Sequence, residues 1–153
     1  MNGIGFALEE IDTSTPTRRA RLKWVIAVRD TLAPGQAANA AICVAAATMP
    51  HVAGLLGPDA KDADGTVHPG LPWTGCSIVA ADAATLRDIR ARAAAHEATF
   101  VADMPAVGQA VRVYDEYLDA VAQTPVEAFE YAAVGIVGPR NKVDRIIRSL
   151  PLL

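Results

Sequence analysis

The side chains best placed to bind a ligand lie at the start of an expected helix, directly after a buried strand. Residues 22–49 read LKWVIAVRDTLAPGQAANAAICVAAATM, which predicts an apolar strand, a Pro-Gly turn and a small-residue helix. A ligand of such a unit usually lies at the helix start, where unpaired N–H groups meet the positive end of the helix dipole. Gly35, Gln36 and Asn39 stand there, without a lysine, histidine or nucleophile beside them. The Asn39 amide can contact a ligand or satisfy a neighbouring loop.

A second group of polar side chains lies in the long segment Pro50–Gly75, which holds four prolines and five glycines. Its possible ligands for a cation are Asp59, Asp62, Asp64 and His68. Their spacing departs from an EF-hand, because Ala60 stands at the first ligand position and Leu71 at the closing glutamate. His51 and His96 are too isolated to complete a zinc site. We therefore expect no metal and no cofactor, and interpret the segment as a structured polar loop or a ligand lid, with a turn at Asp64-Gly65.

Asp103 and Tyr117 are two further candidates for ligand binding. Asp103 follows the expected strand Thr99–Ala102, at the edge where ligands of open α/β sheets bind. Its alternative role is to cap the helix expected after Pro105. Tyr114 continues an apolar stripe and is expected in the core, whereas Tyr117 stands among acidic residues. Tyr117 is therefore the better candidate for a ligand or dimer contact. The alternative is that Tyr117 is an ordinary surface tyrosine of an amphipathic helix.

The order of elements predicts a three-layer α/β/α fold, with a mixed sheet of about four strands and helices on both faces. The expected strands are Leu22–Val28, Cys76–Ala80, Thr99–Ala102 and Tyr131–Val137. The expected helices cover Gln36–Met49, the residues from Asp82 to about His96, a helical repeat over 107–121, and the residues after Gly138-Pro139. Residues 1–20 are interpreted as an N-terminal extension, and 21–153 as a single domain.

Composition narrows the classes of partner. The chain has 153 residues, is 52% hydrophobic and carries a net charge of −3, which argues against an electrostatic nucleic-acid binder. The basic C-terminal segment, with Arg140, Lys142, Arg145 and Arg148, is therefore expected to be a solvated face. Neither a signal peptide nor a membrane span is evident, so we expect a cytoplasmic protein. Cys43 and Cys76 lie in apolar surroundings and are expected to be buried, reduced thiols, with a disulfide or a reactive thiol as alternatives.

Three segments of the chain resemble type II peptidyl-tRNA hydrolases. They are the opening strand, turn and helix KWVIAVRDTLAPGQAANAA, the middle segment CSIVAADAATLRDIRARAAAHEATFVAD, and the ending AAVGIVGPRNKVDRIIRSLPLL. The chain resembles more closely a bacterial family that shares this fold, domain-of-unknown-function family 2000. That likeness includes GQAANAA, the loop LLGPDAKDADGTVHPGLPW and the Tyr114-x-x-Tyr117 helix. It covers nearly everything after residue 20 and implies a peptidyl-tRNA hydrolase II-like fold.

The hydrolase residues transfer poorly to this sequence. In the hydrolases the first helix begins Gly-Lys-Gly-Lys-Ile-Ala-Ala-Gln, with a histidine three residues later. Set against Gly35, the second lysine, the glutamine and the histidine fall on Ala38, Ile42 and Ala45, and the hydroxyl residues of the last strand fall near Ala132 and Ala133. Only the family aspartate is matched, by Asp103. Methyl groups can neither orient water nor stabilise an oxyanion, so ordinary peptidyl-tRNA hydrolysis is not expected.

Three hypotheses follow for the function. The first is small-ligand binding at the helix start, framed by Gly35, Gln36, Asn39, Asp103 and the Asp62–His68 loop. The second is a hydrolase of peptidyl-tRNA or a related ester, acting through Asp103 and a relocated partner such as His68. The third is a non-catalytic homodimeric interaction module: the resemblance implies dimers, and an alanine-rich helix fits a symmetric interface. Whether the protein is an enzyme is left open by its sequence.

Overall fold

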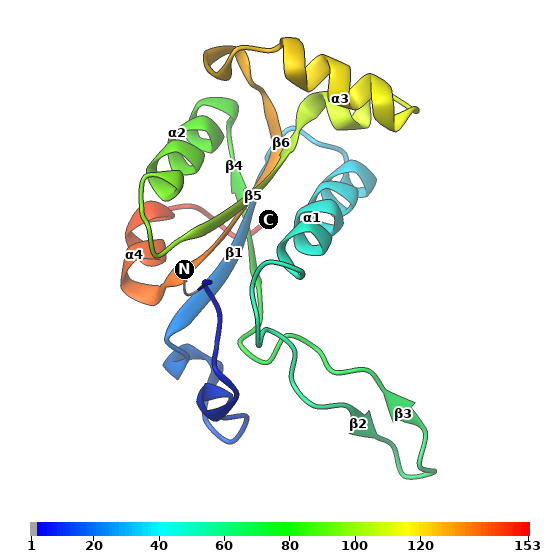
Figure 1. Ribbon diagram of the computed structural model, residues 1–153, viewed down its shortest axis with the longest axis vertical. Coiled ribbons are helices and arrows are strands. Elements are labelled where there is room, and N and C mark those ends of the chain that lie inside the picture. The colour runs from blue at the N-terminus through cyan, green and yellow to red at the C-terminus, as the bar shows by residue number, and fades with distance from the viewer. Residues whose placement is uncertain (1–2) are drawn as a thin grey trace.

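The computed structural model describes residues 3–153 and has a four-stranded mixed sheet between helices on both faces (Figure 1). The order across the sheet is β4 (Ser77–Ala81), β1 (Leu22–Arg29), β6 (Tyr131–Pro139) and β5 (Phe100–Pro105). Strand β1 is parallel to β4, and β6 runs antiparallel to both of its neighbours. The expected three-layer α/β/α class is therefore confirmed.

Helix α1 (Pro34–Thr48) covers one face of the sheet, and α2 (Ala83–Ala94) with α4 (Arg140–Ile146) covers the other. The remaining elements are the short helices η1 (Leu8–Glu10), η2 (Thr17–Arg19), η3 (Ala106–Gln109) and η4 (Val126–Ala128), the hairpin strands β2 (Ala60–Lys61) and β3 (Val67–His68), and α3 (Tyr114–Gln123). No helix within residues 3–153 is both long and apolar enough to cross a bilayer.

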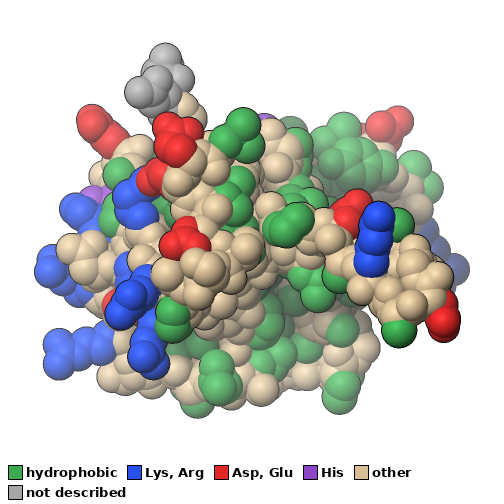
Figure 2. All heavy atoms as spheres, turned by 90° about the horizontal axis from the view of Figure 1, so that it is seen from below, with side chains coloured by type: hydrophobic (Ala, Val, Ile, Leu, Met, Phe, Trp, Pro, Cys, Tyr) green, Lys and Arg blue, Asp and Glu red, His purple; other side chains and the backbone are tan. Residues whose placement is uncertain are grey.

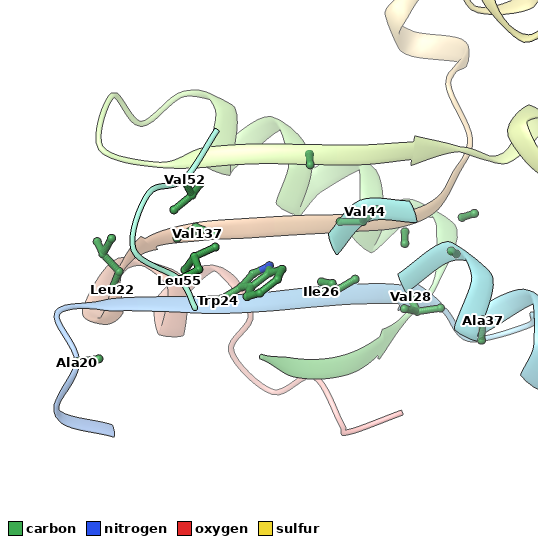
Figure 3. Packing of buried hydrophobic residues seen from close by; sticks show 14 of the residues in the cluster. Ala20, Leu22, Trp24, Ile26, Val28, Ala37, Val44, Val52, Leu55 and Val137 are labelled. Carbon is green, nitrogen blue, oxygen red and sulfur yellow. The ribbon is translucent and has the colours of Figure 1, made fainter. Parts of the chain in front are cut away.

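Strand β1 is buried on both faces, which explains its nearly continuous apolar sequence. Trp24, Ile26 and Val28 point toward α1, as Figure 3 shows, while Val25 and Ala27 point toward α2 and α4. The packing of α1 on the sheet is close, because β6 has a glycine, Gly135, beneath the helix. A Cβ added at Gly135 would overlap Cγ1 of Val44 on α1.

Helix α2 forms as its sequence predicts. Asp82 caps it by accepting a hydrogen bond from the Thr85 N–H at 2.8 Å. Leu86, Ile89 and Ala93 are its buried residues, and they pack against the face of the sheet opposite α1. These three positions recur at helical spacing, so the buried side of α2 follows from its sequence.

The described part of the N-terminal extension packs on the body. The Phe6 N–H donates to the Ala53 carbonyl at 2.9 Å, and the Phe6 ring packs against Trp73 with centroids 4.9 Å apart. Arg21 binds Glu10 through its Nε at 2.7 Å, which fixes η1 against the start of β1. Residues 1–2 of the extension lie outside the described residues.

The long segment after α1 contains the β2–β3 hairpin, which projects from the body as an arm (Figure 1). We define the arm as residues 57–71. Its tip is the expected tight turn: Gly65 has φ +86° and donates from its N–H to the Asp62 carbonyl at 3.1 Å. The arm and α3 lie at opposite ends of the molecule (Figure 1).

The expected helical repeat over 107–121 is wrong in its extent, because η3 and α3 are separate helices. Val113 between them has extended geometry, so the helical phase is interrupted. The expected core position of Tyr114 is also wrong, since 73% of this residue is exposed. All ten residues of α3 belong to the described chain, and none of them is buried. The periodicity is real, but the contact of η3 with α3 covers this helix only in part, and Tyr114 and Leu118 stay exposed.

Candidate functional site

A groove with a volume of about 510 Å³ lies between α1 and α3. Cys43, Ala46 and Ala47 of α1 line one side of this α1–α3 groove, and Met104 and Tyr117 line the other. The groove is wide because its α1 side consists of small residues. The walls are mainly apolar, which is typical of small-molecule sites.

Gly108 of η3 keeps space open between two of these side chains. A Cβ at this position would lie 3.2 Å from Cε of Met104 and 3.8 Å from Cδ2 of Tyr117. A larger side chain at Gly108 would therefore extend into the groove. The flexible thioether of Met104 allows the adjoining wall to adapt in shape.

Tyr117 contributes a polar group to the groove and is partly buried. Burial raises the pKa of its hydroxyl, and the neighbouring Tyr114 and Asp103 raise that pKa further. The hydroxyl is therefore neutral at physiological pH and can donate or accept a hydrogen bond. Arg112 lies at the exposed rim, and it forms no ion pair with any residue of the described range 3–153.

Asp103 borders the groove at the edge strand β5, but its carboxylate is held by α2. Its Oδ2 accepts a hydrogen bond from Nε of Arg90 at 3.0 Å. Along β5, Ala102 and Met104 face α1, whereas Val101 faces α2. Asp103 alternates with Met104 and therefore shares the α2 side. It does not cap the following helix, since η3 has no side-chain cap.

The N-terminus of α1 is bridged by Gln109 of η3, a residue that sequence reasoning did not single out. Its Nε2 donates to the Gln36 carbonyl at 2.8 Å and to Oδ1 of Asn39 at 3.2 Å. The Gln36 side chain is occupied as well, because its Oε1 accepts from the Ala33 N–H at 3.3 Å. Oδ1 of Asn39 is thus bonded to a side chain of η3 and not to the backbone of a loop, and a ligand contact of Asn39 stays a prediction. Gly35 is exposed.

A smaller hollow of about 300 Å³ lies beside this helix start and is lined in part by Arg29, Gln36 and Tyr131. The Arg29 guanidinium forms an ion pair with Glu130, and Arg87 binds the same carboxylate at 2.6 Å. This pair neutralises the charge of Arg29, whereas the buried Nε of Arg29 has no hydrogen-bond partner within residues 3–153.

The polar residues of the arm stabilise its own turn. Oδ1 of Asp62 accepts from the N–H groups of Asp64 at 3.0 Å and Thr66 at 2.9 Å, and its Oδ2 lies 3.3 Å from Nε2 of His68. The Thr66 N–H is the main cause that lowers the pKa of the Asp62 carboxyl. Within residues 3–153, no group of three or more histidine, cysteine or acidic side chains is arranged for a metal ion.

Within one chain, the arm lies far from the start of α1. Asp62, Asp64 and His68 lie on the arm below the C-terminal end of α1, whereas Gln36 and Asn39 lie at its N-terminal end (Figure 1). The helix between them has 15 residues and is therefore about 22 Å long. The predicted frame of the ligand site is thus divided between the two ends of the molecule.

The expected burial of both cysteines is wrong for Cys43, which is exposed on α1, whereas Cys76 is partly buried and both are free. We expect a maleimide at pH 8 to label Cys43 rapidly in the folded protein. Cys76 should stay unlabelled until unfolding, because burial raises the pKa of its thiol to about 12. Mass spectrometry of the folded protein should show one adduct. Two adducts, or an adduct on Cys76 in a Cys43→Ser variant, would contradict the assignment.

Positive side chains gather on the side of the body away from the arm, as Figure 2 shows from below. Arg18, Arg19 and Arg140 line a shallow hollow there. The guanidinium of Arg140 is engaged by backbone, since it donates to the carbonyls of Ala20 at 3.2 Å and Thr17 at 3.0 Å. Arg140 therefore ties the extension to α4.

A family model described as a protein of unknown function, DUF2000, matches residues 22–153. The chain belongs to the DUF2000 family. The match begins at Leu22, so the N-terminal extension lies outside the DUF2000 model. No curated protein matches the chain in sequence.

Among solved structures, this DUF2000 chain is similar to the protein of unknown function Atu0240 from Agrobacterium tumefaciens strain C58. The TM-score is 0.80 and the sequence identity 18%, over 87% of this chain and 98% of that one. At this identity the likeness shows the fold alone. The likeness to type II peptidyl-tRNA hydrolases stays a prediction from sequence.

Proposed function

We propose that this DUF2000 protein binds a small molecule with an apolar body and an anionic end in the α1–α3 groove. The observation that carries the proposal is the groove itself, whose volume of about 510 Å³ falls within the usual range of ligand sites. Its apolar walls would take the body of such a molecule. This position is beside α1, rather than at the helix start that the sequence favours.

The polar groups around the groove favour an anionic end on the ligand. The Arg112 guanidinium is free to form a bidentate pair with a carboxylate or phosphate. The Tyr117 hydroxyl can donate a second hydrogen bond. Asp103 would repel such a group weakly, because Arg90 already neutralises its charge at 3.0 Å.

Binding is favoured over hydrolysis by the positions of the two candidate catalytic residues. A general base must lie within hydrogen-bond reach of the group that it activates. The Asp103 carboxylate is bound to Arg90 on the α2 side, and His68 is paired with Asp62 on the arm. Within one chain, Asp103 and His68 are therefore not placed to act on the same atom of a substrate.

A panel of aromatic carboxylates, aliphatic carboxylates, organic phosphates and neutral amides of the same shape would test the proposal by thermal unfolding. We expect a saturable rise in Tm with some of the anions and a smaller rise with their amides. At a concentration one hundred times Kd, the stabilisation is about 2.7 kcal/mol. If no member of the panel raises Tm, ligand binding of this class is contradicted.

Variants locate the site. We expect Gly108→Leu to abolish the shift by filling the groove, and Arg112→Ala to reduce the preference for anions over amides. Arg148→Ala, which removes an exposed arginine outside the groove, is the matched control and should leave the shift unchanged. Gln36→Ala tests the helix start. Loss of binding in Gln36→Ala, with binding retained in Gly108→Leu, would place the ligand at the start of α1 instead.

A further inference from the structure

We propose that the ligand of the α1–α3 groove is the carboxyl-terminal end of an extended peptide, which adds to the free edge of β5 as a parallel strand. This inference rests on the proposed function for the position of the ligand. The last residues of such a peptide supply both the apolar body and the anionic end. Three features of the chain carry the inference: an open strand edge, an apolar wall beside it, and a cation beyond its end.

The outer edge of β5 is open. Strand β5 lies at one end of the sheet order, and in the described chain it pairs with β6 alone. The Ala102 carbonyl oxygen faces β6, since it lies 3.6 Å from the Cβ position of Gly135, the residue opposite. Because successive residues of a strand direct their backbone groups to opposite edges, Val101 and Asp103 direct theirs outward. No loop or turn backbone within residues 3–153 is hydrogen-bonded to either of them.

The opposite edge of the sheet, at β4, is covered by residues 151–153. The Ala80 N–H donates to the Pro151 carbonyl at 2.9 Å, and the Leu153 N–H donates to the Ile78 carbonyl at 3.2 Å. An uncovered strand edge is a template for pairing with another chain, so proteins usually cover or interrupt their edges. Of the two edges of this sheet, the one at β5 is therefore available for an added strand.

The α1–α3 groove borders this open edge. Asp103 and Met104 of β5 line the groove together with the small residues of α1. Ala102 and Met104 face α1, and a peptide residue added opposite either of them directs its side chain to the same face of the sheet. Two alternate side chains of the peptide therefore enter the groove, and its apolar walls select apolar ones. Strand addition typically combines main-chain bonds with pockets for alternate side chains in this way.

Arg112 and Pro105 determine the direction of the peptide and its last residue. Arg112 follows β5 and η3 in the chain, and α3 lies beyond the C-terminal end of β5 (Figure 1). A peptide whose carboxylate binds Arg112 must therefore run parallel to β5. The added ladder also ends there, because Pro105 has no N–H to donate to a further carbonyl. The last peptide residue thus lies opposite Met104, and its carboxylate can form a bidentate pair with Arg112.

This register assigns the main-chain bonds of the added strand. In parallel pairing, one residue bonds to both neighbours of the residue opposite it. The third-last peptide residue, opposite Ala102, donates to the Val101 carbonyl and accepts from the Asp103 N–H. The last residue donates to the Asp103 carbonyl. The second-last residue directs its backbone away from β5 and its side chain away from the groove.

Peptides with N-methyl groups test the added strand. The probes are acetyl-Thr-Val-Thr-Leu with a free carboxylate, and its relatives with valine, leucine or phenylalanine at the last and third-last residues, titrated by calorimetry. For the tightest probe, N-methylation of the last or the third-last residue should weaken binding about tenfold, because each removes a donor to β5. N-methylation of the second-last residue is the matched control and should leave the affinity unchanged. Equal losses at all three positions would overturn the proposal.

The C-terminal amide of the same peptide tests the contact with Arg112. We expect the amide to bind about tenfold more weakly than the acid. Arg112→Ala should reduce the affinity for the acid to that for the amide, whereas Arg148→Ala, the control outside the groove, should leave both affinities unchanged. Equal binding of acid and amide by the wild-type protein would overturn the proposed end of the peptide.

Hydrogen exchange of the protein's own amides, followed by NMR, reports on the edge directly. The Asp103 N–H should exchange rapidly in the free protein and slowly when the peptide is bound. The Ala102 N–H, which is directed at β6, is the internal control and should be protected in both states. Unchanged exchange at Asp103 in the peptide complex would overturn the added strand. Protection of Asp103 without peptide that disappears on dilution would assign the edge to a second copy and also overturn it.

The experiments separate failure of this inference from failure of the groove proposal. If small carboxylates raise Tm and no peptide binds, the added strand is overturned and the groove proposal stands. If peptides bind with the alternating losses and no small anion raises Tm, the added strand stands and the small-molecule proposal fails.

Discussion

Gly135→Ala is expected to destabilise the protein by about 2 kcal/mol, although alanine normally suits a strand better than glycine. The added methyl group would overlap Cγ1 of Val44 on α1. It cannot escape sideways, because the Ala102 carbonyl oxygen and Cγ1 of Ile26 each lie 3.6 Å from the new Cβ. Either α1 or β6 must shift. Urea denaturation monitored by circular dichroism would measure the loss as a lower midpoint with an unchanged slope.

Two further variants test whether overlap with Val44 causes the loss of stability in Gly135→Ala. Val44→Ala alone should cost about 2 kcal/mol, through lost burial. The double variant should be more stable than the sum of the single effects predicts, by about 1 kcal/mol, because the alanine removes the overlapping methyl group. Gly35→Ala is the matched control: its Cβ meets nothing within 4 Å, and α1 should gain stability. A neutral Gly135→Ala would mean that α1 does not approach β6 so closely.

The sheet and α2 were predictable because their sequences determine which side is buried. In β1 the apolar run is continuous, which is typical of a central strand covered on both faces. In α2, Leu86, Ile89 and Ala93 alternate with arginines, so a single stripe can face the core. Asp82 precedes that helix as its N-cap, and in the structure its carboxylate accepts the expected hydrogen bond from the Thr85 N–H.

The surroundings of α1 and α3 could not be predicted in the same way. Helix α1 has apolar residues on all sides, so the periodicity of its sequence does not distinguish the buried Val44 from the exposed Cys43. Helix α3 has a clear apolar stripe through Tyr114, but a stripe indicates a helix and not the presence of an element that covers it. Both errors concern residues that line the α1–α3 groove.

The candidate site was only partly accessible from sequence. Asp103 and Tyr117 do border one groove, as candidates should, yet Met104 and Gly108 attract no notice without the fold. The separation of the arm from the start of α1 follows from helix geometry, since a segment that leaves the C-terminal end of a helix begins a helix length away from its start. The bond from Arg90 to Asp103 depends on strand alternation in β5 and required the observed register.

Phe6→Ala is expected to cost about 3 kcal/mol, which would make the N-terminal extension an integral part of this fold. The DUF2000 match begins at Leu22, yet Phe6 is only 5% exposed and packs in the α1-side core against Trp73. Its ring also lies beneath the Arg21 guanidinium, 5.6 Å from the ring centroid. Removing the ring would leave a cavity beside Trp73 that the neighbouring backbone, bonded at Ala53, cannot close. Guanidinium denaturation followed by tryptophan fluorescence would measure the loss.

Leu8→Ala separates burial from any general effect of changing the extension. Leu8 is two residues away and 86% exposed, so its truncation should change stability by less than about 0.5 kcal/mol. The difference between the two variants reports the packing of Phe6 alone, because both remove a large apolar side chain from the same segment. Equal effects would mean that the extension is not packed on Trp73. A large effect for Phe6→Ala alone would place the boundary of the folding unit before Phe6, and Arg140, which binds the carbonyls of Thr17 and Ala20, would then join the two ends of a single domain.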